Sequence, residues 1–282
     1  MLKYIQTFRL RTLPLSMAGI IMGTGYAYPN IDWLVFALAI LTTLSLQILA
    51  NLCNEVGDAQ HGTDAEQQAR VAYGLQSGAI TLKEMMMCIY IFIALCVIFG
   101  TCLVWLSFGT LLCWQSLVFI ILGAAAICGA MTYTMGRHAY GYHGFGDLAV
   151  MLFFGLLSGV GAYYLQTKLL TLEIFEAAFA IGMPIVGVIN LNNIRDMDND
   201  VAHGKITLAA RLGKHQAKVY HACLLVCSIV SFISLGHYWV LLVAPLWAWH
   251  IKYVFDNQGP ALDKQMPVLM FSTLVLAVLA CL

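Results

Sequence analysis

The chain has 282 residues, of which 61% are apolar and only 10% are charged. Soluble domains are about half apolar and about a quarter charged, so this composition excludes a soluble globular protein and indicates a membrane-embedded one. Lys and Arg number 14 and so do Asp and Glu, and the resulting net charge of zero gives no electrostatic basis for binding nucleic acid.

Apolar runs long enough to cross a bilayer follow one another along the chain. The start is interrupted by Arg9, Arg11 and Pro14, so we expect no cleaved signal peptide. The runs are continuous rather than alternating, which is typical of helices and not of the strands of a membrane barrel. They predict nine helices, over residues 12–29, 33–54, 85–106, 109–131, 147–166, 174–192, 216–235, 238–255 and 267–282.

The basic residues fall on one side of this predicted arrangement. If the N-terminus is cytoplasmic, all but one of the 14 Lys and Arg lie in cytoplasmic segments, and Lys168 alone lies opposite. Such a bias is the positive-inside signal of membrane proteins. We therefore predict an all-α, polytopic transmembrane bundle in the cell membrane, inner or plasma, with a cytoplasmic N-terminus.

Two long polar loops, roughly 55–84 and 193–215, hold most of the acidic charge. Four predicted helices separate them, so both face the cytoplasm, and they share a sequence pattern. A constant offset of 142 residues pairs Asn51 with Asn193, Asn54 with Asp196, Asp58 with Asp200, and His61-Gly62 with His203-Gly204. This match predicts a parallel internal duplication. We expect a single domain over 1–282, with four-helix pseudo-repeats over about 8–131 and 147–255 and one further helix.

Each copy carries amide and carboxylate groups at positions i, i+3 and i+7, which share one face of a helix. Oxygen ligands of this kind suit Mg²⁺, which typically uses one or two carboxylates together with substrate phosphates. Ionisable groups at membrane depth are costly and mark function. We predict two such faces, opposed across a cavity, each binding a metal ion that holds one diphosphate. The candidate ligands are Asn51, Asn54, Asp58, Asn193, Asp196 and Asp200.

Basic residues on the same side provide candidates for neutralising diphosphate oxygens and the charge of a leaving group. These candidates are Arg70, Arg137, Arg195 and Lys205. Positive-inside topology alone also explains any one of them.

These residues resemble the UbiA superfamily of intramembrane aromatic prenyltransferases, whose members carry an Asn/Asp-rich first motif and a second DxxxD motif. Asp196-x3-Asp200 fits the second motif. Asn54-Glu55-x2-Asp58, followed by Asp64, fits the first, with the longer spacing of the menaquinone-pathway branch. Glu55 departs from the family, which usually has Asp there. Further stretches that look like this branch are 8–16, 74–81, 133–137, 141–147, 153–155, 192–196 and 204–213.

The resemblance implies transfer of a polyprenyl chain from its diphosphate to 1,4-dihydroxy-2-naphthoate, with loss of CO₂ and diphosphate, giving demethylmenaquinone. It implies a lipid-embedded site with two Mg²⁺ ions acting as Lewis acids, for which Glu55 and Asp64 are further ligands. Asp58 and Asp196 are then central to catalysis.

The resemblance also suggests roles for three residues outside the acidic motifs. Tyr133 is expected to face the allylic cation, Asp147 to deprotonate or orient the acceptor, and Arg11 to bind the acceptor. A Tyr of the membrane interface and an acidic cap at a helix start are the alternatives for the first two.

Two other hypotheses stay open. The same fold and chemistry serve a different acceptor, such as 4-hydroxybenzoate, or the repeated helix ends bind the coupling cation of a secondary transporter. Against the transporter, the acidic residues lie at one membrane face rather than at the midplane.

Overall fold

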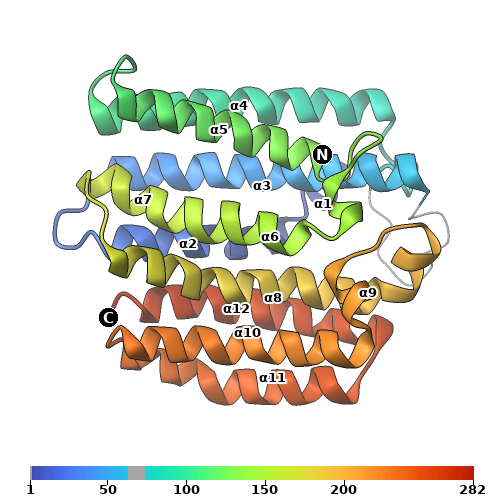
Figure 1. Ribbon diagram of the computed structural model, residues 1–282. Coiled ribbons are helices and arrows are strands. Elements are labelled where there is room, and N and C mark those ends of the chain that lie inside the picture. Colours follow the sequence, from blue (N-terminus) through green and yellow to red (C-terminus); the bar gives the residue numbers. More distant parts are fainter. Residues whose placement is uncertain (1, 63–73) are drawn as a thin grey trace. The chain divides into compact units, whose positions relative to one another are not determined.

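The computed structural model describes residues 2–62 and 74–282, which are helical apart from turns and loops and include no strand (Figure 1). The helices belong to two compact units. The first comprises Met1–Leu13 and Asp32–His143, and the second comprises Pro14–Ile31 and Gly144–Leu282. The hydrophobic segment 14–31 therefore belongs to the unit that the C-terminal half forms.

The first unit is built on three long helices. Its helical segments are α1 (Leu2–Thr7), η1 (Leu10–Thr12), α3 (Trp33–His61), α4 (Leu82–Phe108), α5 (Trp114–Thr132) and η2 (Tyr140–His143). The Asp32 carboxylate caps the start of α3, where it accepts hydrogen bonds from the backbone N–H groups of residues 34 and 35. Thr81 and Glu84 form a capping box at the start of α4. Leu49, Leu52 and other apolar side chains of α3 are buried against α4.

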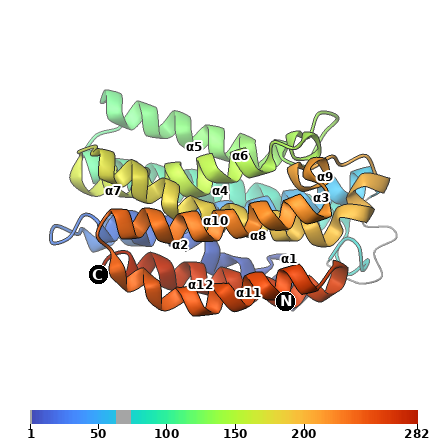
Figure 2. The same ribbon diagram turned by 60° about the horizontal axis from the view of Figure 1, so that its bottom comes forward.

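The second unit surrounds one long helix, α8, which is mostly buried. The helices α10 and α12 run alongside it, and α11 packs against α10 and α12 (Figures 1 and 2). The helical segments of the second unit are α2 (Leu13–Gly25), α6 (Gly146–Val150), the π-helical η3 (Met151–Leu157), α7 (Ser158–Thr167), α8 (Leu172–Ala202), α9 (Leu208–Leu212), α10 (Lys214–Ser234), η4 (Tyr238–Val243), α11 (Ala244–Asp256), η5 (Gly259–Lys264) and α12 (Gln265–Leu279).

Small residues let the helices of the second unit approach closely. A Cβ on Gly19 of α2 would collide with the Ser158 side chain, and one on Gly23 would collide with the backbone of Gly159. Gly155 of η3 likewise packs against α8. Within a bilayer there is no hydrophobic force between helices, so such close backbone packing supplies the attraction.

Pro184 lies inside α8 without ending it. Because proline has no N–H, the carbonyl of Ala180 loses its partner within the helix. The Ser228 hydroxyl of α10 donates to this carbonyl at 2.7 Å. A neighbouring helix thus satisfies the freed group, which is how proline is tolerated in membrane helices.

Within residues 2–62 and 74–282, seven helical segments are long and apolar enough to cross a membrane. They coincide with seven of the predicted spans, and the predicted all-α fold is confirmed. The other two predicted spans, 12–29 and 238–255, correspond to α2 and α11, which have 13 residues each. The first ends in turns before Pro29, and the second is preceded by the 3₁₀ segment η4.

The helices that carry the two motifs are longer than the apolar runs predict. The α3 helix continues past residue 54 to His61, and α8 continues past residue 192 to Ala202. Both motifs therefore lie on helices, as predicted. The pseudo-repeat bounds stay a prediction.

Candidate functional site

Each motif helix ends at a His-Gly pair, with α3 ending on His61 and α8 ending one residue before His203. His61 donates through Nδ1 to the carbonyl four residues earlier at 2.8 Å, and His203 donates in the same way at 2.9 Å. The glycine after each histidine, Gly62 and Gly204, has a positive φ of 71° and 76°, a backbone conformation that glycine adopts without steric cost. The His-Gly pair thus marks the end of both motif helices, and the duplication stays a prediction.

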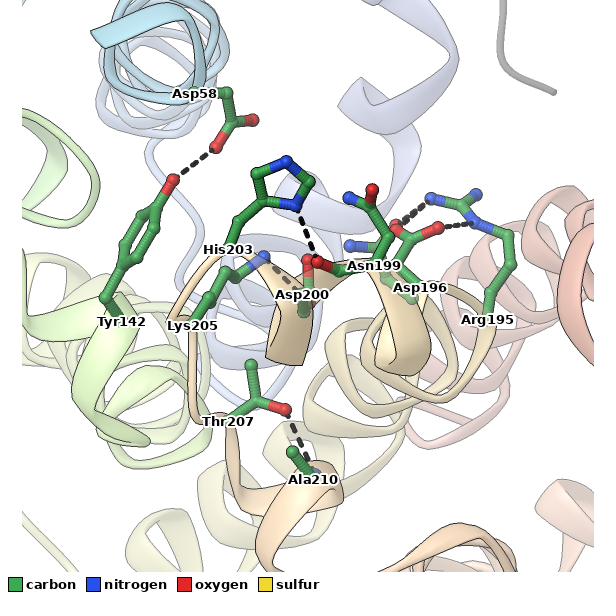
Figure 3. Close-up of polar contacts among 11 residues, drawn as sticks. Asp58, Tyr142, Arg195, Asp196, Asn199, Asp200, His203, Lys205, Thr207 and Ala210 are labelled. Carbon is green, nitrogen blue, oxygen red and sulfur yellow. Dashed lines mark hydrogen bonds and ion pairs between the residues drawn. The ribbon is translucent and has the colours of Figure 1, made fainter. Parts of the chain in front are cut away.

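In the second unit, the predicted metal ligand Asp196 is buried and paired with Arg195 (Figure 3). Arg195 Nε lies 2.9 Å from Asp196 Oδ1, and Nη2 lies 2.7 Å from Oδ2, which is a bidentate contact. The same guanidinium donates to Asn192 and to Asp263. Arg195, which the sequence predicted as a diphosphate ligand, therefore contacts a predicted metal ligand, and its role toward diphosphate stays a prediction.

Asp200 has a basic partner of its own. Its Oδ2 lies 3.1 Å from Nζ of Lys205, and its side chain is only 4% exposed (Figure 3). The backbone N–H of Lys205 also donates to the carbonyl of Asp200 at 2.8 Å. The loop that carries Lys205 ends where Thr207 caps α9. The predicted ligand Asn193 is buried on the same helix. A candidate phosphate-binding lysine and a candidate metal ligand thus lie side by side.

In the first unit, the loop after α5 supplies the partners of the motif. Tyr142 donates its hydroxyl to Asp58 Oδ1 at 3.2 Å (Figure 3). Its ring centroid lies 4.4 Å from that of His61. Thr134 donates to Asn54 Oδ1 at 3.1 Å. Neither Tyr142 nor Thr134 was predicted from the sequence. Their only signal was membership of the stretches 133–137 and 141–147.

Asn51 and Glu55, two more predicted ligands of this unit, contact neighbouring parts of the chain. Asn51 Nδ2 donates to the Phe8 carbonyl and to Thr12 Oγ1, both at 3.0 Å. Glu55 is 1% exposed, and its Oε1 accepts the N–H of Leu75 at 2.6 Å. Both side chains hold segments that flank α3, so metal ligation by either stays a prediction.

Asp147 is buried in the first turn of α6 and is hydrogen-bonded to Tyr220 of α10. Its Oδ2 is buried and has no hydrogen-bond partner among the described residues. A buried carboxylate oxygen of this kind is available to a polar substrate group. The contact with Tyr220 was not predicted.

Tyr133 ends α5, and its ring centroid lies 5.3 Å from that of Tyr140. Burial raises the pKa of Tyr140 to about 12, so its hydroxyl stays protonated and donates to the carbonyl of Gly129 at 2.9 Å. Arg11 and Arg137 are exposed. The remaining predicted residues, Asp64 and Arg70, lie outside the described residues.

The donor set fits a divalent cation that shares its coordination with a substrate. Among residues 2–62 and 74–282, no group of three His, Cys, Asp or Glu is close enough to hold a metal alone. Mg²⁺ does not need such a group, because phosphates and water complete its shell around one or two carboxylates. Asp196 and Asp200 are buried oxygen donors. Each already has a cationic partner.

Residues 16–275 match the UbiA prenyltransferase family, so the chain belongs to that family. It is 40% identical to 1,4-dihydroxy-2-naphthoate octaprenyltransferase of Escherichia coli (strain K12), over 93% of this chain and 88% of that protein. The protein of the same description from Haemophilus influenzae is 37% identical, over 91% of this chain and 86% of that one. The resemblance inferred from the motifs is confirmed.

Two solved structures have the same fold. A UbiA homologue from Archaeoglobus fulgidus bound to DMAPP and Mg²⁺ superimposes with a TM-score of 0.67 at 14% identity, over 99% of both chains. The apo structure of a UbiA homologue from Aeropyrum pernix K1 gives a TM-score of 0.62 at 18% identity, over 98% of both chains. At these identities the similarity establishes the fold alone.

Proposed function

We propose that this chain transfers a polyprenyl group from polyprenyl diphosphate to 1,4-dihydroxy-2-naphthoate, with loss of CO₂ and diphosphate, in menaquinone biosynthesis. The supporting observation is the 40% identity, over 93% of the chain, to a protein with this acceptor and activity in its name. The buried carboxylates of both motifs agree with this activity, since they can bind the cation that the departing diphosphate needs.

Asp196, Asp200 and Asn193 in the second unit, and Asp58 and Asn54 in the first, are the proposed holders of two Mg²⁺ ions. Binding of Mg²⁺ by a homologue of the same fold, together with DMAPP, supports the choice of metal. When bound, Mg²⁺ supplies Lewis-acid stabilisation of the diphosphate charge. Asn51, Glu55 and Asp64 complete the set of proposed ligands.

The chain's own side chains account for the remaining steps. Lys205, Arg137 and Arg70 are proposed to neutralise diphosphate oxygens as the allylic C–O bond breaks. The Tyr133 ring faces the allylic cation. Asp147, with its buried Oδ2, accepts a hydroxyl proton of the acceptor or orients that hydroxyl.

The naphthoate then forms the new carbon–carbon bond at the ring carbon that carries its carboxyl group. That group departs as CO₂ and leaves its electron pair in the ring, which restores aromaticity. Arg11 is the proposed contact for the acceptor.

We propose that the protein resides in the cell membrane with its N-terminus and both motifs on the cytoplasmic side. The support is the near-exclusive placement of Lys and Arg on that side of the helices. A site within the bilayer keeps water from the carbocation and leaves the prenyl chain among lipids.

The experiment compares two acceptors in purified protein. Labelled polyprenyl diphosphate and Mg²⁺ are incubated with 1,4-dihydroxy-2-naphthoate or with 4-hydroxybenzoate. We expect a prenylated product with the naphthoate only, and its loss on chelation and in Asp58→Asn and Asp196→Asn. Asp198→Asn is the matched control, since Asp198 lies on the same helix but is 82% exposed and pairs with Lys214. A product formed with 4-hydroxybenzoate alone would show that the acceptor is 4-hydroxybenzoate and not the naphthoate. No product with either acceptor would refute the proposed prenyltransferase activity.

A further inference from the structure

The loop between α11 and α12 makes a polar contact with the second motif. Asp263 of η5 accepts a hydrogen bond from Nη1 of Arg195 at 2.5 Å. Arg195 is 7% exposed and Asp263 is 44% exposed, so the contact joins a buried cation to a carboxylate at the surface. This contact gives the loop between the last two helices a place beside a motif.

Arg195 is held by three acceptors at once. Nε and Nη2 contact the two carboxylate oxygens of Asp196, Nη2 contacts Asn192 Oδ1 at 2.6 Å, and Nη1 contacts Asp263. A guanidinium is planar and rigid, so acceptors on different sides fix its orientation. Because both oxygens of Asp196 bond to this plane, the orientation of Arg195 sets the orientation of the Asp196 carboxylate.

The loop that carries Asp263 is itself anchored. Lys218 of α10 is 5% exposed, and its Nζ donates to the carbonyls of Phe255 at 3.1 Å and Asn257 at 2.7 Å. These carbonyls lie at the end of α11, where a cation satisfies groups without helical partners. The Asn257 side chain also donates back to the Tyr253 carbonyl at 2.9 Å. Lys218 therefore fixes the start of the loop that carries Asp263.

Charge explains why a second carboxylate on Arg195 matters. A guanidinium paired with Asp196 alone would cancel the negative charge that attracts a divalent cation. With Asp263 on its other edge, the guanidinium divides its positive charge between two carboxylates. The Asp196 carboxylate is thus oriented by Arg195 and still attractive to Mg²⁺.

We propose that Asp263 is a positioning residue that acts through Arg195 to orient the Asp196 carboxylate and preserve its charge for a divalent cation. This inference rests on the proposed function of Asp196 as a metal ligand. Outer contacts of metal ligands generally contribute about 10–100-fold to metal affinity.

The test measures metal binding without turnover. Mn²⁺ binding to the purified protein is followed by electron paramagnetic resonance in the presence of inorganic diphosphate, and is normalised to folded protein. We expect Asp263→Asn to weaken Mn²⁺ affinity about tenfold, the lower end for such contacts, and Asp263→Glu to retain most of it. In the prenyl-transfer assay, Asp263→Asn should raise the Mg²⁺ concentration at half-maximal rate while the rate at saturating Mg²⁺ changes little.

Two further variants separate this role from a structural one. Arg195→Lys keeps the charge but lacks the planar fork that contacts both oxygens of Asp196, so it should weaken Mn²⁺ binding, and Asp263→Asn should add little in that background. Lys214→Ala, which breaks an exposed ion pair to the same helix, should leave affinity unchanged. Unaltered Mn²⁺ affinity of folded Asp263→Asn, beside weakened binding by Asp196→Asn, would overturn the inference. Unaltered binding by Asp196→Asn would instead overturn the proposed metal site.

Discussion

The hydrogen bond between Ser228 and the Ala180 carbonyl offers a sharp test of how α8 accommodates its proline. The carbonyl has no helical partner because Pro184 lacks an N–H, and the Ser228 hydroxyl supplies one at 2.7 Å in a fully buried position. Leaving a buried acceptor unsatisfied costs about 1–3 kcal/mol, and hydrogen bonds between membrane helices contribute at most about 1.7 kcal/mol. We therefore predict that Ser228→Ala lowers the free energy of unfolding by about 1.5 kcal/mol.

The matched background is Pro184→Ala, in which the amide of residue 184 restores the bond to the Ala180 carbonyl. There, Ser228→Ala should lower the free energy of unfolding by only about 0.5 kcal/mol, which gives a coupling of about 1 kcal/mol in the double-mutant cycle. The assay is reversible unfolding of purified protein in mixed micelles of increasing dodecyl sulfate content, followed by circular dichroism. An equal loss in both backgrounds would refute the reasoning.

Three further predictions concern other positions. Glu55→Ala should lower the thermal unfolding temperature more than Glu55→Gln, because the glutamine still accepts the N–H of Leu75; equal losses in the two variants would contradict this. Lys205→Ala should raise the KM for polyprenyl diphosphate about tenfold, since a hydrogen bond to a charged group contributes about 1.5 kcal/mol, and an unchanged KM would exclude its role as a phosphate ligand. Gly23→Leu should abolish monodisperse protein in gel filtration, because a Cβ there meets the backbone of α7, whereas Gly123→Leu, with no atom within 4 Å of its Cβ, should behave as wild type.

The first acidic motif shows what the local sequence pattern can predict and what it cannot. The spacing of Asn51, Asn54 and Asp58 predicted one helix face, and all three residues lie within α3. The hydropathy pattern nevertheless ended this helix at residue 54, seven residues early. Hydropathy detects only the apolar part of a helix, whereas the backbone hydrogen bonds continue through polar residues until a glycine such as Gly62 ends them.

The hydrogen-bond partners of the motif residues could not be predicted from the sequence. Arg195 was predicted to bind diphosphate from its charge and place, and the structure adds contacts with Asp196 and with Asp263, the latter 68 residues away in the chain. Tyr142 reaches Asp58 across 84 residues. One chain carries many tyrosines and acidic residues, and nothing in their spacing says which pair the packing of helices will bring within hydrogen-bond distance.

The sequence by itself determined the membrane setting, the helical fold and the residues of the two acidic motifs. Each of these depends on composition or on spacing within one helix, and such local properties are set by transfer of side chains into lipid and by helical periodicity. Tertiary structure alone decided the surroundings of each motif carboxylate. It assigned Arg195 to support Asp196, Lys205 to Asp200, and Glu55 to the turn at Leu75. These contacts depend on how separate helices pack, which no local pattern encodes.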